Sequence, residues 1–123
     1  MQKLRKAVVL GGSGFLGRYL LKEIINTYQE VIVYDKSPIL DGPEGLNHVN
    51  GDILDSELLG STLSGSDIVF HLAGCSDIED CIEDPVGATE ANILGTAKVL
   101  EAARINNVKK FVFASSLYVY SRV

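Results

Sequence analysis

The segment with the most specific chemistry is Gly-Gly-Ser-Gly-Phe-Leu-Gly at residues 11–17, between a short apolar run and a helical pattern. Gly11 permits a tight turn off a strand, and Gly14 lets backbone amides approach an anion without an intervening side chain. Gly17 lets the following helix pack closely on a sheet. The N–H groups at that helix start favour a pyrophosphate. The spacing therefore predicts a dinucleotide-binding loop; the alternative is a glycine-rich turn without a ligand.

A carboxylate completes this pattern. Asp35 ends the next apolar run, at 30–34, where an acid can accept hydrogen bonds from the ribose hydroxyls of adenosine. A 2′-phosphate would meet a like charge there, which predicts NAD rather than NADP as the cofactor. The adjacent Lys36 would soften that preference. The alternative is that Asp35 is only a turn residue at the end of a strand.

Alternating strand and helix signals would position these groups. We expect strands at 6–10, 30–34, 46–50, 67–72 and 109–114, helices at 15–25, 55–63 and 85–106, and loops at 37–45 and 74–84. The strands lack polar alternation, which is typical of a parallel sheet covered on both faces. With right-handed crossovers this predicts an α/β doubly wound parallel sheet, Rossmann-like, with strand order 3-2-1-4-5 and helices on both faces.

Helical spacing also predicts which side chains face the core. In the helix at 15–25 the apolar positions are Phe15, Leu16, Tyr19, Leu20 and Ile24. In the helix at 85–106, which Pro85 is suited to begin, they include Val86, Ala91, Leu94, Ala97, Leu100 and Ala103 or Ala102. Asp55 or Ser56 is the expected cap of the short helix at 55–63.

Charge and composition exclude several classes of function. The net charge of −5 argues against a nucleic-acid binder. No apolar run is long enough to cross a membrane, and the run at 7–10 is too short for a signal peptide, so we expect a cytoplasmic protein. The acidic residues at 77–90 suggest a solvated loop and helix start, the alternative being a cation site; we predict no metal. Cys75 and Cys81 do not form a disulfide framework, and we expect reduced thiols.

Further segments resemble the extended short-chain dehydrogenase/reductase family, the nucleotide-sugar epimerases and dehydratases. The loop at 11–17 is followed in order by Gly-Asp-Ile at 51–53, His-Leu-Ala-Gly at 71–74, Asn-Ile-Leu-Gly-Thr at 92–96 and Phe-Ala-Ser-Ser-Leu-Tyr-Val-Tyr at 113–120. Each motif alone is weak, but their shared order over nearly the whole chain is specific.

The resemblance implies hydride transfer between NAD and a small-molecule substrate, a nucleotide sugar or related alcohol, coupled to proton transfer. It implies that Ser116 is the catalytic serine that orients the substrate oxygen; the alternative is that Ser116 only caps the strand end. Together with the loop chemistry it assigns as cofactor-binding Gly11, Gly14, Phe15, Leu16, Gly17, Asp35, Lys36, Asp52, Ile53, Leu72, Ala73, Gly74, Asn92 and Ser115.

One part of the family pattern is missing. The catalytic Tyr-x-x-x-Lys does not occur, and Tyr118 is followed at that distance by Arg122, which cannot replace a lysine cleanly. We therefore expect residues 1–123 to be a truncated dinucleotide-binding domain without its substrate domain, inactive alone. The alternative is a non-catalytic NAD(P)-binding sensor or regulatory module. Family members often pair through the helix at 85–106, so a homodimer is a candidate assembly, formed either by that helix face or by the bare edge of the strand at 109–114.

Overall fold

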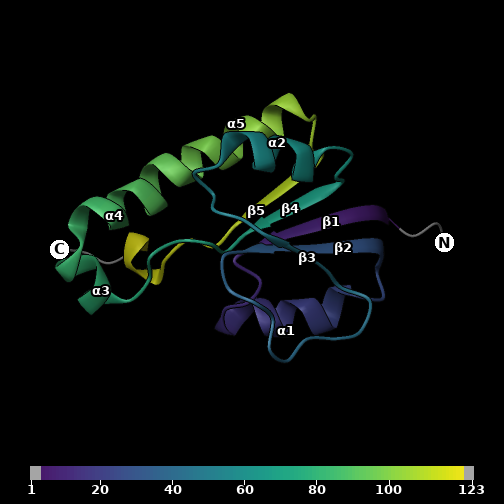
Figure 1. Ribbon diagram of the computed structural model, residues 1–123, viewed down its shortest axis with the longest axis horizontal. Coiled ribbons are helices and arrows are strands. Elements are labelled where there is room, and N and C mark those ends of the chain that lie inside the picture. The colour runs from purple at the N-terminus through teal and green to yellow at the C-terminus, as the bar shows by residue number, and fades with distance from the viewer. Residues whose placement is uncertain (1–3, 121–123) are drawn as a thin grey trace.

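One sheet of five parallel strands forms the centre of the computed structural model, which describes residues 4–120 (Figure 1). The strands are β1 (Leu4–Leu10), β2 (Tyr28–Asp35), β3 (Asn47–Asn50), β4 (Ile68–His71) and β5 (Lys110–Phe113). They lie in the order β3-β2-β1-β4-β5, and every pairing is parallel. The predicted α/β fold and strand order are confirmed.

Two core layers enclose the sheet. Along β1, Ala7 and Val9 face one layer while Val8 and Leu10 face the other, and all four are fully buried. The helix α1 (Phe15–Ile24) covers the first face, and α2 (Ser56–Leu63) with α5 (Thr96–Ile105) covers the second (Figure 1). Burial on both faces explains why the strands are continuously apolar.

The inward face of α1 differs from the prediction. Gly17, Leu21 and Ile24 are buried, which confirms the prediction at Ile24, whereas Phe15, Leu16 and Tyr19 are largely exposed, so the expected apolar face was wrong at these three positions. The reason is the close contact at Gly17, where a Cβ would collide with the main chain of Gly12. That backbone contact fixes the rotation of the helix and turns the aromatic residues outward.

The segment at 74–84 was expected to be a loop, and this prediction is wrong in part. It contains the short helix α3 (Ile78–Glu83), capped by the Asp77 carboxylate, which accepts hydrogen bonds from the N–H groups of Glu79 and Asp80. Asp55 caps α2 in the same way, as predicted, by accepting from the Leu58 N–H at 3.0 Å.

The long helix is divided into three parts. The helix α4 (Pro85–Thr89) is followed by a π-helical turn, η1 (Glu90–Gly95), and then by α5. The buried positions are Gly95, Val99, Ala102 and Ala103, so the prediction is confirmed at Ala102 and Ala103, whereas Val86, Leu94, Ala97 and Leu100 of the predicted face are exposed. A π turn holds an extra residue and shifts the helical phase, which explains why the uninterrupted periodicity was wrong at these four positions.

The carboxyl-terminal strand β5 lies at an edge of the sheet, with Val112 and Phe113 about half exposed. The main chain of an edge strand can pair with a strand of another segment or another molecule. Between residues 4 and 120, no helix combines the length and the apolar character that crossing a bilayer requires.

Candidate functional site

The glycine loop begins with a turn that only glycine adopts easily. Gly11 has φ of +79° and its N–H donates to the Tyr34 carbonyl at 2.9 Å. A Cβ at Gly11 would lie 2.6 Å from the Ala73 nitrogen. Gly11 therefore lets β1 turn while the segment after β4 passes directly against it.

The start of α1 leaves room for an anion. Gly14 is the N-cap and makes no side-chain capping hydrogen bond. A Cβ there would have only the Gly11 carbonyl near it, at 3.4 Å. The N–H groups of the first helical turn have no carbonyl partner within the helix and can bind an anionic group.

Asp35 is held against this loop. Its Oδ2 accepts a hydrogen bond from the Ser13 N–H at 3.0 Å, and its Oδ1 accepts from the Ser37 N–H at 2.9 Å. The Ser13 hydroxyl donates to the Ser37 carbonyl at 2.8 Å, which joins the two turns. The Ser37 contact is that of a turn residue, whereas the Ser13 contact orients the carboxylate beside the glycine loop. A carboxylate has about four acceptor positions, so capacity for ribose hydroxyls remains.

The Gly51–Ile53 segment borders Asp35 from β3. The Tyr34 ring occupies the space that a side chain at Gly51 would need, and its hydroxyl donates to the Asp52 carbonyl at 2.7 Å. Burial, helped by the charges of Asp55 and Asp52, raises the pKa of Tyr34 to about 12, which keeps that hydroxyl a donor. Lys36 pairs with Asp52 at 3.4 Å on the surface.

Ile53 is placed differently from its neighbour. Its side chain is buried and contacts the position of Gly95, where a Cβ would lie 2.5 Å from the Ile53 Cδ1. Any contact between Ile53 and a ligand on this surface therefore has to use its main chain.

Asn92 is exposed, and its side-chain amide binds the loop after β4. Its Oδ1 accepts from the Cys75 N–H at 2.8 Å, and its Nδ2 donates to the Cys75 carbonyl at 2.9 Å. A Cβ on Gly74 would lie 2.6 Å from that Oδ1, so the pair fits only without a side chain at 74. Asn92 thus positions the segment that contains Leu72 and Ala73, which makes an indirect contribution to a cofactor site the simplest role.

Ser115 and Ser116 follow β5, at the same carboxyl edge of the sheet as the glycine loop. Ser115 and Ser116 are exposed, and the Ser116 Oγ accepts a hydrogen bond from the Tyr118 N–H at 3.2 Å at the start of a 3₁₀ turn, η2 (Leu117–Tyr120). This contact is local to the turn that follows β5, and the hydroxyl proton can still be donated. Arg122, which follows Tyr118 in the spacing considered above, lies outside the described residues.

Sequence reasoning missed a role for His71. The ring is almost fully buried, contacts Phe111 and Phe113, and places Nε2 2.9 Å from the Thr96 Oγ1. Burial lowers the pKa of His71, so the neutral ring is favoured. His71 thereby joins β4 to the first turn of α5, a pairing that sequence separation concealed.

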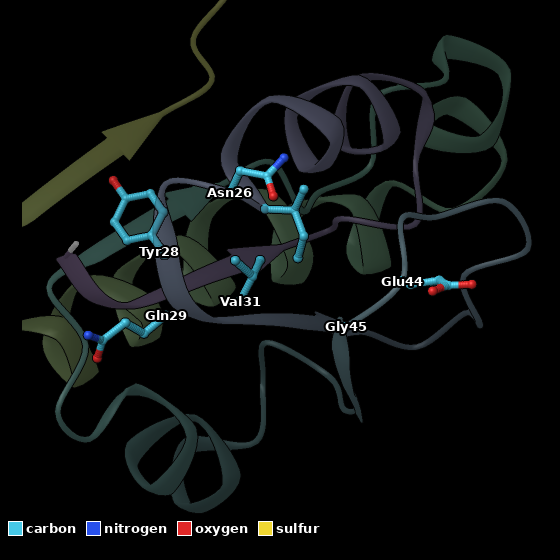
Figure 2. A pocket seen from close by; sticks show the side chains of 7 residues that line it. Asn26, Tyr28, Gln29, Val31, Glu44 and Gly45 are labelled. Carbon is cyan, nitrogen blue, oxygen red and sulfur yellow. The ribbon is translucent and has the colours of Figure 1, made fainter.

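The predicted residues meet along the carboxyl ends of the strands, and none of them lines either of two hollows found elsewhere in residues 4–120. A hollow of about 390 Å³ lies instead near the start of β2, between the end of α1 and the 44–45 turn (Figure 2). A second, of about 290 Å³, lies between α2 and α5. Neither is lined by a residue of the glycine loop, and residues 4–120 hold no cluster of three or more His, Cys, Asp or Glu suited to a metal.

The site lies where the chain direction across the sheet reverses, because β1 has β2 on one side and β4 on the other. Ligands of doubly wound sheets bind at this switch point. A glycine loop there, with a carboxylate at the end of the next strand, defines the class of dinucleotide-binding domains. Residues 7–123 match the NAD dependent epimerase/dehydratase family, and the chain belongs to this family.

Curated relatives are longer than this chain. A dTDP-D-glucose 4,6-dehydratase of Dictyostelium discoideum is 34% identical, with 95% of this chain matching 30% of the relative. A UDP-glucose 4-epimerase of Yersinia enterocolitica is 30% identical, with 92% of this chain matching 37% of it. The chain therefore spans about a third of the length of these relatives.

Solved structures agree. The epimerase Mth375 of Methanothermobacter thermautotrophicus is 30% identical and superposes with a TM-score of 0.89, over 98% of this chain and 38% of that one. MoeE5, solved with UDP-glucose and NAD, is also 30% identical and has a TM-score of 0.83, over 96% of this chain and 38% of its own.

Proposed function

We propose that this chain is the NAD-binding portion of an enzyme that epimerises, dehydrates or oxidises a nucleotide sugar or a related alcohol. The observation that carries the proposal is the Asp35 carboxylate fixed by the Ser13 N–H beside the glycine loop. In the proposed complex the loop amides bind the pyrophosphate and Asp35 accepts from the adenosine ribose. NAD supplies a hydride acceptor or donor, and the Ser116 hydroxyl orients the substrate oxygen.

Cofactor preference follows from the same carboxylate. Asp35 would repel the 2′-phosphate of NADP, and Lys36, turned toward Asp52 at 3.4 Å, neutralises little of that repulsion. The membership in the family and NAD in the MoeE5 structure support this choice.

Thermal unfolding with NAD and NADP at matched concentrations tests the proposal. A ligand at about 100 times its Kd adds about 2.7 kcal/mol to stability, so NAD should raise the Tm clearly and NADP less. Asp35→Asn should narrow the difference between the two, while Asp41→Asn, an exposed acid in the neighbouring loop, should leave it unchanged. Equal shifts with NAD and NADP in the unsubstituted chain would contradict the role of Asp35.

A non-catalytic NAD(P)-binding module is the second candidate. The contact of the Ser116 Oγ with the Tyr118 N–H favours it, because a serine used as a cap need not serve catalysis. We expect no turnover by the 123-residue chain under either proposal. NADH production or sugar epimerisation by the purified chain would contradict that expectation and exclude the non-catalytic module.

For the assembly, we propose a homodimer formed through the exposed face of the long helix. Val86, Leu94 and Leu100 support it, because they are exposed apolar side chains along this helix. Replacing Leu94 and Leu100 by serine should convert a dimer into a monomer, as measured by light scattering; a monomeric unsubstituted chain would contradict the proposal.

The two free thiols support a cytoplasmic location.

A further inference from the structure

Two thiols lie together at the carboxyl edge of the sheet. Cys75 follows β4, and Cys81 lies in α3. The Cys81 Sγ donates to the Cys75 carbonyl at 3.6 Å, and the Cys75 Sγ contacts the Asp77 carbonyl at 3.8 Å. Both cysteines are free and only partly buried, so a small reagent can reach them.

The main chain on both sides of this pair is held in place. The amide of Asn92 binds the N–H and the carbonyl of Cys75, at 2.8 and 2.9 Å. The Cys81 N–H donates to the Asp77 carbonyl at 3.1 Å, and the Asp77 carboxylate caps the same helix. Two sulfurs presented by fixed backbones lose little freedom when they are joined.

We propose that Cys75 and Cys81 form a reversible disulfide by exchange with a low-molecular-weight disulfide, and that this bond weakens NAD binding by displacing the loop after β4. Formation of the disulfide stands on the geometry of the two thiols. Its effect on NAD rests on the proposed function.

The exchange proceeds in two balanced steps. One cysteine thiolate attacks a sulfur of the small disulfide, whose S–S bond breaks, so that a mixed disulfide forms and one small thiolate leaves. The second cysteine thiolate then attacks the protein sulfur of that mixed disulfide and releases the second small thiolate. The protein loses two electrons, the small disulfide gains them, and the two protons released by the cysteines end on the two small thiols.

The surroundings of Cys75 set the rate of this exchange. The hydrogen bond with Cys81, together with burial and the charges of Cys81, Asp80 and Asp77, raises the pKa of Cys75 to about 11. The thiol form therefore dominates at neutral pH, and the step that uses the Cys75 thiolate should accelerate about tenfold per pH unit between pH 7 and 9.

A disulfide would reach the proposed cofactor surface through one residue. The S–S bond, about 2 Å long, is much shorter than a thiol contact and draws α3 toward Cys75. It also removes the thiol hydrogen bond that Cys81 gives to the Cys75 carbonyl. The same carbonyl accepts from Asn92, so the displacement passes to Gly74 and Ala73, and Ala73 lies against Gly11.

The test is to incubate the purified chain with oxidised glutathione and then cleave it with a protease that cuts after glutamate. Glu79 lies between the cysteines, so cleavage there separates them unless a disulfide joins the two peptides. Cys75→Ser and Cys81→Ser are the matched controls, and each should carry one glutathione adduct. In the unsubstituted chain, linked peptides should exceed adduct about tenfold, because the second thiol acts intramolecularly.

The affinity for NAD is then measured by calorimetry on the reduced and the oxidised chain. We expect the oxidised chain to bind about fivefold or more weakly, with recovery on reduction and no change in Cys81→Ser. Glutathione adducts without linked peptides, or linked peptides with unchanged affinity, would overturn the proposal. Failure of the reduced chain to bind NAD would contradict the proposed function and the effect on NAD, while the linked peptides would still decide whether the disulfide forms.

Discussion

At the scale of single residues, the main contacts of the site are made between side chains and main chain. Asp35 binds the Ser13 N–H, Tyr34 binds the Asp52 carbonyl, and Asn92 binds both main-chain groups of Cys75. These bonds fix loops at the ends of three different strands. The residues that would orient a ligand are thus shaped by neighbours that need not touch it.

Asn92 offers the sharpest test of this arrangement. Asn92→Ala removes two hydrogen bonds and should lower the stability by about 1–2 kcal/mol, since an intramolecular hydrogen bond contributes about 1 kcal/mol. It should also speed amide exchange after β4 and weaken NAD binding. Asn47→Ala is the control. It removes a 3.4 Å contact with Glu30, near the start of β2, and should leave the stability, the amide exchange and the NAD binding unchanged. Unaltered NAD binding in Asn92→Ala would contradict a positioning role.

The sequence predicted the residues of the site better than their contacts. The roles of the glycines at 11, 14 and 17 can be predicted from the sequence, because their spacing fits a tight turn, an anion-binding helix start and a close helix contact. The partners of Asn92 and His71 are not readable, because Cys75 and Thr96 are brought to them by folding. Chain separation hides such pairs, and neither residue type indicates its partner.

At the scale of elements, the strands were predicted correctly and the helix faces less so. Short continuous apolar runs indicate buried parallel strands because such strands are covered by helices on both faces. The rotation of α1 depends on the backbone contact at Gly17, and that of α5 on the π turn before it. The helix α3 was missed because an acidic six-residue segment without a buried residue carries no periodicity.

The observed rotation of α1 predicts unequal costs for two leucines. Leu21 is fully buried, so Leu21→Ala should lower the free energy of unfolding by about 2–5 kcal/mol. Leu16 is 56% exposed, so Leu16→Ala should change it by no more than about 0.5 kcal/mol. Urea denaturation measures both, and equal losses would contradict the observed rotation of α1.

Asp67 joins the amino-terminal ends of three elements and predicts a dependence on pH. Its carboxylate accepts from the N–H groups of Arg5 and Lys6 and from the Lys109 Nζ at 2.6 Å. The hydrogen bond from Lys109, helped by that from Lys6, holds the pKa of Asp67 below its usual range despite some desolvation.

A lowered pKa in the folded state means that this carboxylate stabilises the fold above its unfolded pKa of about 3.9 and loses that contribution as the pH falls toward the folded value. Asp67→Asn should therefore unfold at a lower temperature than the unsubstituted chain at pH 7. The difference should shrink below about pH 4. A constant difference from pH 7 to pH 3 in thermal scans would contradict the assignment, and Asp41→Asn is the exposed control.

At the scale of the whole molecule, the predicted site is an open surface along the carboxyl ends of β1 to β4. Figure 1 shows α3 and α4 projecting beyond this edge, so the loops after β4 and β5 lie between the sheet and these helices. The hollow at the start of β2 faces the other end of the strands and contains none of the predicted residues (Figure 2). We therefore expect NAD to bind at the carboxyl edge of the sheet and not in this hollow.

Amide hydrogen exchange with and without NAD tests that placement most directly. We expect NAD to slow amide exchange in the segments 11–17, 35–37, 51–53 and 72–75, which lie together only in the fold. The exchange rates of residues 25–31 and 44–45 should stay unchanged. Protection around Tyr28 and Glu44, or no protection at the glycine loop while NAD raises the Tm, would contradict it.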